Sequence, residues 1–412
     1  MRQPFATTGK IYEPVSWLPG IQRTGRPRPE ATLREDAVMI ALGVFTLTAL
    51  FWDGIVHNNL VGIDSFWSWA HIAMYTGLTA LGVWIATVLL RHQPDRQVLD
   101  ISMIPRGYGL AVIALPLAAL AGPADFTWHS IYGFENQVDS AYSPPHQGLF
   151  IAGALLAAIP AASAWRRNWR APSLRDFLPA ILSVTAVAGV MLFVIHQLVP
   201  FYAGVSTTSD FQDDLKRYAD AYGGGSGTHH VEGLARAITH YGDGPWPFYF
   251  YSTHHTVAGM LLFTTVVMGA VLLLRRRFTL PVGTLTLMFT AMALWFAMLS
   301  EYREAYLIPS LVLTGIAGDW LLQRLVGTRE PVETWRLRLF AGLVPPILWA
   351  LFFICVAVLG GGLGWGYTLW VGVLCSSAGL SFMLSLLAFA PTGYAPVQDP
   401  VEAALPAERV AA

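Results

Sequence analysis

Residues 37–60 read AVMIALGVFTLTALFWDGIVHNNL, an apolar run in which Asp53 is the only Asp, Glu, Lys or Arg. A helix needs about 20 mostly apolar residues to cross the roughly 30 Å hydrocarbon core of a bilayer, and this run is long enough. Charged residues make up 12% of the chain, about half of the roughly 25% that is usual in soluble domains. The sequence therefore predicts an all-α, polytopic transmembrane helical bundle.

Nine further stretches of the chain show the same length and apolar character. The ten predicted spans are 37–60, 67–90, 107–130, 146–164, 177–202, 250–274, 279–300, 305–325, 338–360 and 366–390. Cytoplasmic loops of membrane proteins hold an excess of Lys and Arg. Ten spans put all 25 basic residues on one side except Lys216, Arg217, Arg236 and Arg303. We therefore predict a multi-pass protein of the cell (inner) membrane with both termini in the cytoplasm.

The spans divide the chain into five regions. Residues 1–36 are predicted to form a cytoplasmic tail, and residues 37–202 hold the first five spans. Residues 203–249 are polar, Gly-rich and acidic, which predicts an outer loop that acts as a lid. Residues 250–390 hold the last five spans, and residues 391–412 are predicted to be a disordered cytoplasmic tail.

Ten of the eleven histidines fall at the outer ends of the predicted spans or in outer loops. Asp53 and His57 are four residues apart near the outer end of the first span, and Asp125 and His129 repeat this spacing on the third. Four residues make about one helical turn, so each carboxylate and imidazole project from one face. A carboxylate inside an apolar span is costly unless it is paired. The repeated spacing therefore predicts a metal site at the outer face.

In each hairpin a further histidine begins the next span, and other donors lie at a similar depth. The predicted metal ligands are Asp53, His57, His71, Asp125, His129, His146, His196, His254, His255 and Glu301. Two imidazoles and one carboxylate suit copper, iron or zinc. No cluster of cysteines or methionines joins these donors.

The run Asp125-Phe126-Thr127-Trp128-His129, followed by Ser143-Pro144-Pro145-His146, resembles a known motif. It is similar to the copper-binding hairpin in the C subunit of the copper membrane monooxygenases, the particulate methane and ammonia monooxygenases. The resemblance implies that Asp125, His129 and His146 bind copper, and that other membrane subunits are partners. It covers residues 125–146, with a longer loop and more spans than that subunit has.

These residues leave three functions open, and they leave open whether the chain is an enzyme. The first is a metal-dependent membrane oxidoreductase, monooxygenase-like, that takes a small apolar substrate from the lipid bilayer. The second is a haem b cytochrome, which needs histidines that face each other across helices. The third is a non-catalytic metal-binding or transport protein. Binding of nucleic acid is not expected, because the sequence has no basic patch.

Overall fold

The computed structural model describes residues 21–59, 66–94, 99–135, 138–205, 246–327 and 334–389. Short 3-10 turns are labelled η, and η5 is a turn of π-helix. In chain order the elements are β1 (Ile21–Gln22), α1 (Leu33–Asn59), α2 (Trp69–Arg91), β2 (Leu99–Asp100), η1 (Ile101–Met103), η2 (Tyr108–Leu110), α3 (Ala111–Tyr132), α4 (Val138–Tyr142), α5 (Pro144–Ala157), α6 (Ile159–Arg166), α7 (Leu174–Val194), η3 (His196–Leu198), α8 (Pro200–Ala203), α11 (Trp246–Arg277), α12 (Thr284–Leu299), η4 (Ala305–Leu307), α13 (Ile308–Leu321), η5 (Leu322–Val326), α14 (Thr334–Leu359) and α15 (Tyr367–Ala388).

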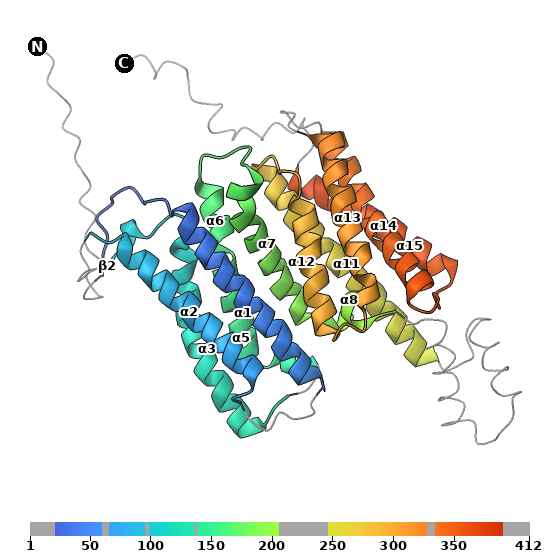
Figure 1. The fold of residues 1–412 in the computed structure, drawn as a ribbon, viewed down its shortest axis with the longest axis horizontal. Coiled ribbons are helices and arrows are strands. Elements are labelled where there is room, and N and C mark those ends of the chain that lie inside the picture. The colour runs from blue at the N-terminus through green and yellow to red at the C-terminus, as the bar shows by residue number, and fades with distance from the viewer. Residues whose placement is uncertain are drawn as a thin grey trace, which may run out of the picture.

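The all-α polytopic bundle predicted from the sequence is confirmed. Within the described residues, nine helical segments are long and apolar enough to cross a membrane, so the chain is a multi-pass membrane protein. α12 occupies the seventh predicted span, but its 16 residues measure only about 24 Å at 1.5 Å per residue. Consecutive spanning helices run in opposite directions (Figure 1).

Two predicted spans differ from the observed helices. The fourth is divided at Ala158 into α5 and α6, with Pro160 in the first turn of α6. The fifth ends at Val194, and His196 lies beyond it in the separate turn η3. Most of the predicted lid and the whole predicted C-terminal tail lie outside the described residues. β1 and β2 form a short parallel pair that the sequence did not predict.

Helix α1 lies between two groups of helices and contacts both. It packs against α2, α5 and α6 on one side and against α7 and α12 on the other. Phe51 of α1 is fully buried and stacks on Trp295 of α12, with ring centroids 5.7 Å apart. The position of α1 is therefore fixed from both sides, and its C-terminal end carries Asp53 and His57.

A buried ion pair anchors the opposite end of α1. Nη2 of Arg167 donates to Oδ2 of Asp36 over 2.6 Å and to the carbonyl oxygen of Ala31 over 2.8 Å. Ser163 and Tyr108 also donate to the Asp36 carboxylate. These contacts join the start of α1 to η2 and to the end of α6. The carboxylate would be left without its charge partner if the guanidinium were removed.

We expect Arg167→Ala to lower the free energy of unfolding by about 3–5 kcal/mol, because it leaves the buried Asp36 charge uncompensated. Thermal or denaturant unfolding in detergent measures this loss. The neighbouring Arg166 is exposed, and Arg166→Ala should change stability by less than about 0.5 kcal/mol. Equal effects of the two substitutions would contradict the anchoring role of Arg167.

Candidate metal centre

The first hairpin presents one carboxylate and two imidazoles at one end of the bundle. Asp53 and His57 lie in the last two turns of α1, and His71 lies in the first turn of α2. Oδ2 of Asp53 is 3.6 Å from Nε2 of His57, and Oδ1 of Asp53 is 3.4 Å from Nε2 of His71. The hairpin thus brings three metal-ligand side chains into contact.

The second hairpin repeats this arrangement with α3 and α5. Oδ1 of Asp125 is 3.4 Å from Nε2 of His129 and 3.0 Å from Nε2 of His146. The other carboxylate oxygen, Oδ2, accepts a hydrogen bond of 2.6 Å from the Tyr75 hydroxyl of α2. The three residues that carry the family resemblance therefore point toward one another.

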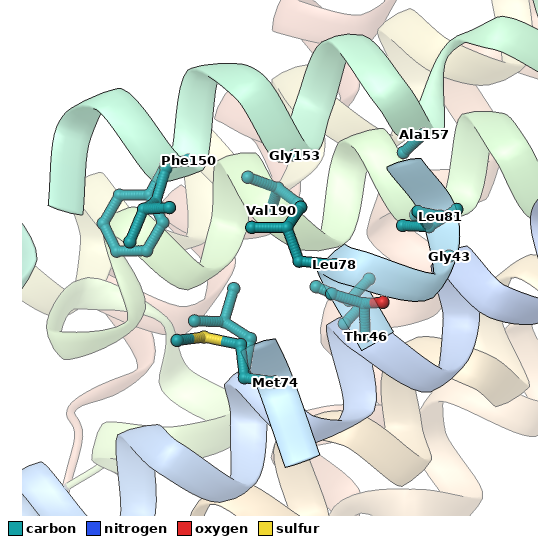
Figure 2. Close-up of a pocket in the computed structure, with 13 residues that line it drawn as sticks. Gly43, Thr46, Met74, Leu78, Leu81, Phe150, Gly153, Ala157 and Val190 are labelled. Atoms are coloured by element: carbon teal, nitrogen blue, oxygen red, sulfur yellow. The ribbon is translucent and has the colours of Figure 1, made fainter. Parts of the chain in front are cut away.

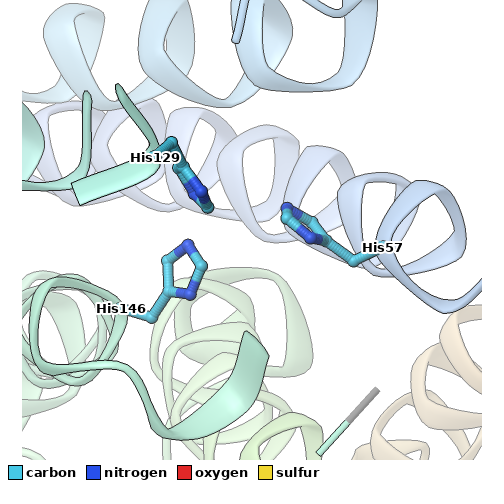
Figure 3. A group of neighbouring side chains, drawn as sticks. All are labelled: His57, His129 and His146. Atoms are coloured by element: carbon cyan, nitrogen blue, oxygen red, sulfur yellow. The ribbon is translucent and has the colours of Figure 1, made fainter. Parts of the chain in front are cut away.

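The two hairpins form a single cluster. The ring centroid of His57 lies 5.8 Å from that of His129 and 5.7 Å from that of His146. Figure 3 shows these three imidazoles facing a common centre from three different helices. Three sets of donor atoms lie within 4.8 Å of one another: Asp53 with His57 and His71, His71 with Asp125 and His129, and His57 with His129 and His146.

Both carboxylates of the cluster are buried, and their ion-pair partners are imidazoles. Asp53 is 4% exposed and Asp125 is 0% exposed. Among the described residues, every ion-pair partner of these two carboxylates is a histidine. Burial of two unbalanced negative charges is expensive. Protons on the carboxylates or the imidazoles, or a divalent cation, must therefore neutralise the cluster.

Hydrogen bonds to the backbone orient three of the imidazoles. A carbonyl oxygen only accepts, so Nδ1 carries the proton in each of these contacts. Nδ1 of His57 donates to the carbonyl of Glu135 over 3.1 Å, and Nδ1 of His129 donates to that of Gly133 over 3.1 Å. His146 donates in the same way to Ser140. The lone pair of each Nε2 is therefore directed at the centre, as in metal-binding histidines.

Local sequence explains how the helix ends reach this geometry. Gly133 follows α3 with a φ of +79°, a conformation that glycine adopts without strain. This turn brings the Gly133 carbonyl back to His129. Ser68 caps α2 by accepting from the backbone N–H of His71 over 3.2 Å. Pro144 begins α5, where a missing N–H is tolerated, and places His146 in the first turn.

Aromatic rings enclose the imidazoles. Phe134 stacks on His129 with ring centroids 4.6 Å apart, and Phe66 stacks on His71 at 4.9 Å. These rings shield the donor atoms from water, which strengthens electrostatic interactions inside the cluster.

Two cavities lie side by side, one at the cluster and one in the apolar interior. A cavity of about 30 Å³ is lined by Asp53, His57, His146 and His196 among other residues. An apolar cavity of about 60 Å³ lies beyond it, between α1, α2, α5 and α7 (Figure 2). The two cavities share the lining residues Leu50, Met74, Leu149 and Phe150. A small apolar molecule thus has a binding space next to the polar cluster.

The structure does not bring the other predicted ligands into the cluster. Nε2 of His196 lies 3.2 Å from the Asn58 side-chain nitrogen, and burial lowers the pKa of His196 to about 4. His254 and His255 are exposed near the start of α11. Glu301 is exposed in the turn after α12, with a φ of +53°. None of these four belongs to a metal-binding set found among the described residues.

Two residues at the cluster were missed by the sequence interpretation. Tyr75 lies one helical turn after His71, and this spacing is the signal that would have placed it on the same face of α2. Glu135 lies in the connection after α3, where no helical period applies, and its Oε2 is 3.3 Å from Nδ1 of His129.

No family model, curated protein or solved structure matches this chain. The chemistry of the site therefore has to be argued from its own side chains. Within the described residues, the chain is a membrane protein with buried His/Asp sets that can hold a metal ion.

Proposed function

We propose that this chain is a copper-dependent membrane oxidoreductase of the monooxygenase type. One observation carries the proposal: five buried donor atoms face one another without a hydrogen-bond partner. They are Oδ1 of Asp53, Nε2 of His57, Nε2 of His71, Oδ1 of Asp125 and Nε2 of His129. Leaving a buried polar atom unsatisfied costs about 1–3 kcal/mol. Five such atoms at one point favour a bound cation.

The donor chemistry supports copper over the alternatives, iron and zinc. Imidazole nitrogen suits all three metals, and the order of affinities for divalent ions peaks at Cu²⁺. The resemblance of residues 125–146 to the copper-binding hairpin of the membrane monooxygenases points the same way. When bound, copper would supply the one-electron and oxygen chemistry that no side chain provides.

The number of donors supports two adjacent ions. Asp53, His57 and His71 would hold one ion, while Asp125, His129 and His146 would hold the other. Three protein ligands on each ion leave coordination positions open, which is the arrangement of catalytic sites. Paired ions in such sites lie about 3.5–4 Å apart, and the donor sets are close enough that each shares a histidine with the next.

The same geometry argues against haem b. Haem ligation needs two opposed histidines with a flat macrocycle between them. Here Asp53 and Asp125 lie between the rings that would be opposed, and the adjoining cavity of about 30 Å³ holds little more than a water-sized group.

The apolar cavity supports a small, apolar substrate taken from the bilayer. Its lining is hydrophobic apart from Thr46, so binding there would be driven by removal of apolar surface from water. Monooxygenation places one atom of O₂ in the substrate and the other in water, and it consumes two electrons and two protons from an external reductant. Tyr75 and Asp125 form the hydrogen-bonded pair that would hold a proton beside the centre.

The charge pattern supports a position of this centre on the extracytoplasmic side of the cell (inner) membrane. Arg91, Arg166 and Arg275 lie at the opposite ends of the spans from His71, His146 and His255, on the side that the excess of basic residues predicts to be cytoplasmic. Other membrane subunits are the proposed source of electrons, since the cluster itself contains no second redox group.

Reoxidation of bound copper by O₂ tests this function. The full chain would be purified in detergent, placed in lipid nanodiscs, loaded with Cu²⁺ and then reduced without oxygen. On addition of O₂, we expect the Cu²⁺ electron paramagnetic resonance signal to return within seconds, with nitrogen splitting from imidazoles. Zinc-loaded protein is the redox-inert control. Copper that binds but stays reduced under O₂ would overturn the oxidoreductase and favour a metal-binding or transport role.

A further inference from the structure

Glu135 contacts one imidazole from each hairpin. It follows α3 in the connection that leads toward α5, and its side chain is mostly buried. Its backbone carbonyl accepts the hydrogen bond from Nδ1 of His57 over 3.1 Å. Its carboxylate Oε2 lies 3.3 Å from Nδ1 of His129. One residue thus holds a proposed ligand of α1 and a proposed ligand of α3.

The carboxylate of Glu135 is itself held in place. Oε1 accepts a hydrogen bond from the indole N–H of Trp128, which lies near the end of α3. Oε2 is buried and has no hydrogen bond of good geometry. A buried carboxylate oxygen that accepts no hydrogen bond destabilises the fold, so we expect this oxygen to have a functional role. The nitrogen beside it is Nδ1 of His129, whose proton is also directed at the carbonyl of Gly133.

Glu135 is placed to act on the metal centre through His129 rather than as a ligand. It belongs to none of the three donor sets found in the described part of the chain, whereas His129 belongs to two. Its contact is with Nδ1, the nitrogen that faces away from the other donors. Histidines that bind metals commonly donate this second N–H to a carboxylate, which fixes the ring and makes Nε2 a stronger ligand.

We infer that Glu135 is a positioning residue of the metal centre. Its carboxylate interacts with the Nδ1–H group of His129, and its backbone carbonyl orients His57. The inference rests on the proposed metal-binding function. Glu135 would then be a third carboxylate of the site, one that does not bind the metal directly. Electron donation by His129, and therefore the affinity and the electronic properties of the bound ion, would depend on the charge of Glu135.

The test compares Glu135→Gln with Asp139→Asn in the purified full chain. Both substitutions remove one negative charge from the same connection, but Asp139 is exposed on α4. Loss of such a carboxylate partner typically lowers metal affinity about 10–100-fold. We expect this fall in Cu²⁺ affinity for Glu135→Gln, together with a shifted electron paramagnetic resonance spectrum, and wild-type behaviour for Asp139→Asn.

The possible results separate this inference from the function on which it rests. Wild-type protein that binds no Cu²⁺ overturns both. Wild-type protein that binds Cu²⁺ while Glu135→Gln keeps the same affinity and spectrum overturns only the role of Glu135. A lower affinity with an unchanged spectrum also overturns it, because a purely structural contribution would weaken binding without altering the ligand field. Unfolding of the metal-free variants checks that the Glu135→Gln substitution leaves the fold intact.

Discussion

Replacing Asp125 with alanine is expected to remove about one of the two metal ions proposed for the wild-type chain. Oδ1 of Asp125 lies 3.4 Å from Nε2 of His129 and 3.0 Å from Nε2 of His146, so its loss removes the carboxylate shared by both imidazoles. Loss of a direct ligand should lower metal affinity by more than the roughly 10–100-fold that follows loss of a residue that contacts a ligand from outside. At micromolar metal concentration, we therefore expect the ion proposed for Asp125, His129 and His146 to be absent.

The repeated hairpin supplies the controls for this prediction. Asp53→Ala should remove the other ion, and the double variant should bind neither. His129→Ala should behave like Asp125→Ala, whereas Asp139→Ala changes an exposed carboxylate and should keep both ions. Metal analysis of detergent-purified protein, with the metal-to-chain ratio measured for each variant, gives the result. Unchanged metal content in Asp125→Ala would show that the cluster is not where the metal binds.

The helices and the central cluster could be predicted because both depend on short-range rules. Length and apolar content predict each span, and the four-residue spacing of Asp53 with His57 and of Asp125 with His129 fixes a common helix face. The positive-inside rule then predicts that these faces share one end of the bundle. These rules are therefore sufficient to predict that the six residues of the cluster lie near one another.

The depth of a residue in the membrane does not show which way its side chain points around the helix, or where its helix lies in the bundle. His254 and His255 were predicted from depth alone, and their exposure on α11 follows from how that helix packs against α7 and α15. His196 was expected at a helix end, but α7 stops at Val194 and the following turn directs the ring toward Asn58. Glu135 could not be predicted, because contacts made by an irregular connection have no sequence period.

Two glycines from different helices line the apolar cavity. Gly43 of α1 and Gly153 of α5 both line it, and a Cβ added at Gly153 would meet no atom within 4 Å. The first carbon of a side chain at position 153 would therefore meet open space at the wall of the cavity. This makes Gly153 the position at which the cavity can be filled while the metal ligands remain in place.

Gly153→Leu is expected to abolish oxidation of a small alkene while leaving the metal centre intact. The leucine would occupy part of the cavity, whose wall residues Leu149 and Phe150 also line the smaller cavity at the polar cluster. We expect epoxide formation to fall more than about tenfold, equivalent to roughly 1.4 kcal/mol of activation free energy. Copper content, the resonance spectrum and O₂-driven reoxidation without substrate should match the wild type.

Gly379→Leu is the matched control for this variant. Gly379 is exposed on α15, and a Cβ added there also meets no atom within 4 Å, so the same substitution is made far from the cavity. Its epoxide formation should equal that of the wild type, as measured by gas chromatography of the product. If Gly153→Leu also retained full product formation, the substrate would have to reach the metal by another route, because a filled cavity cannot bind it.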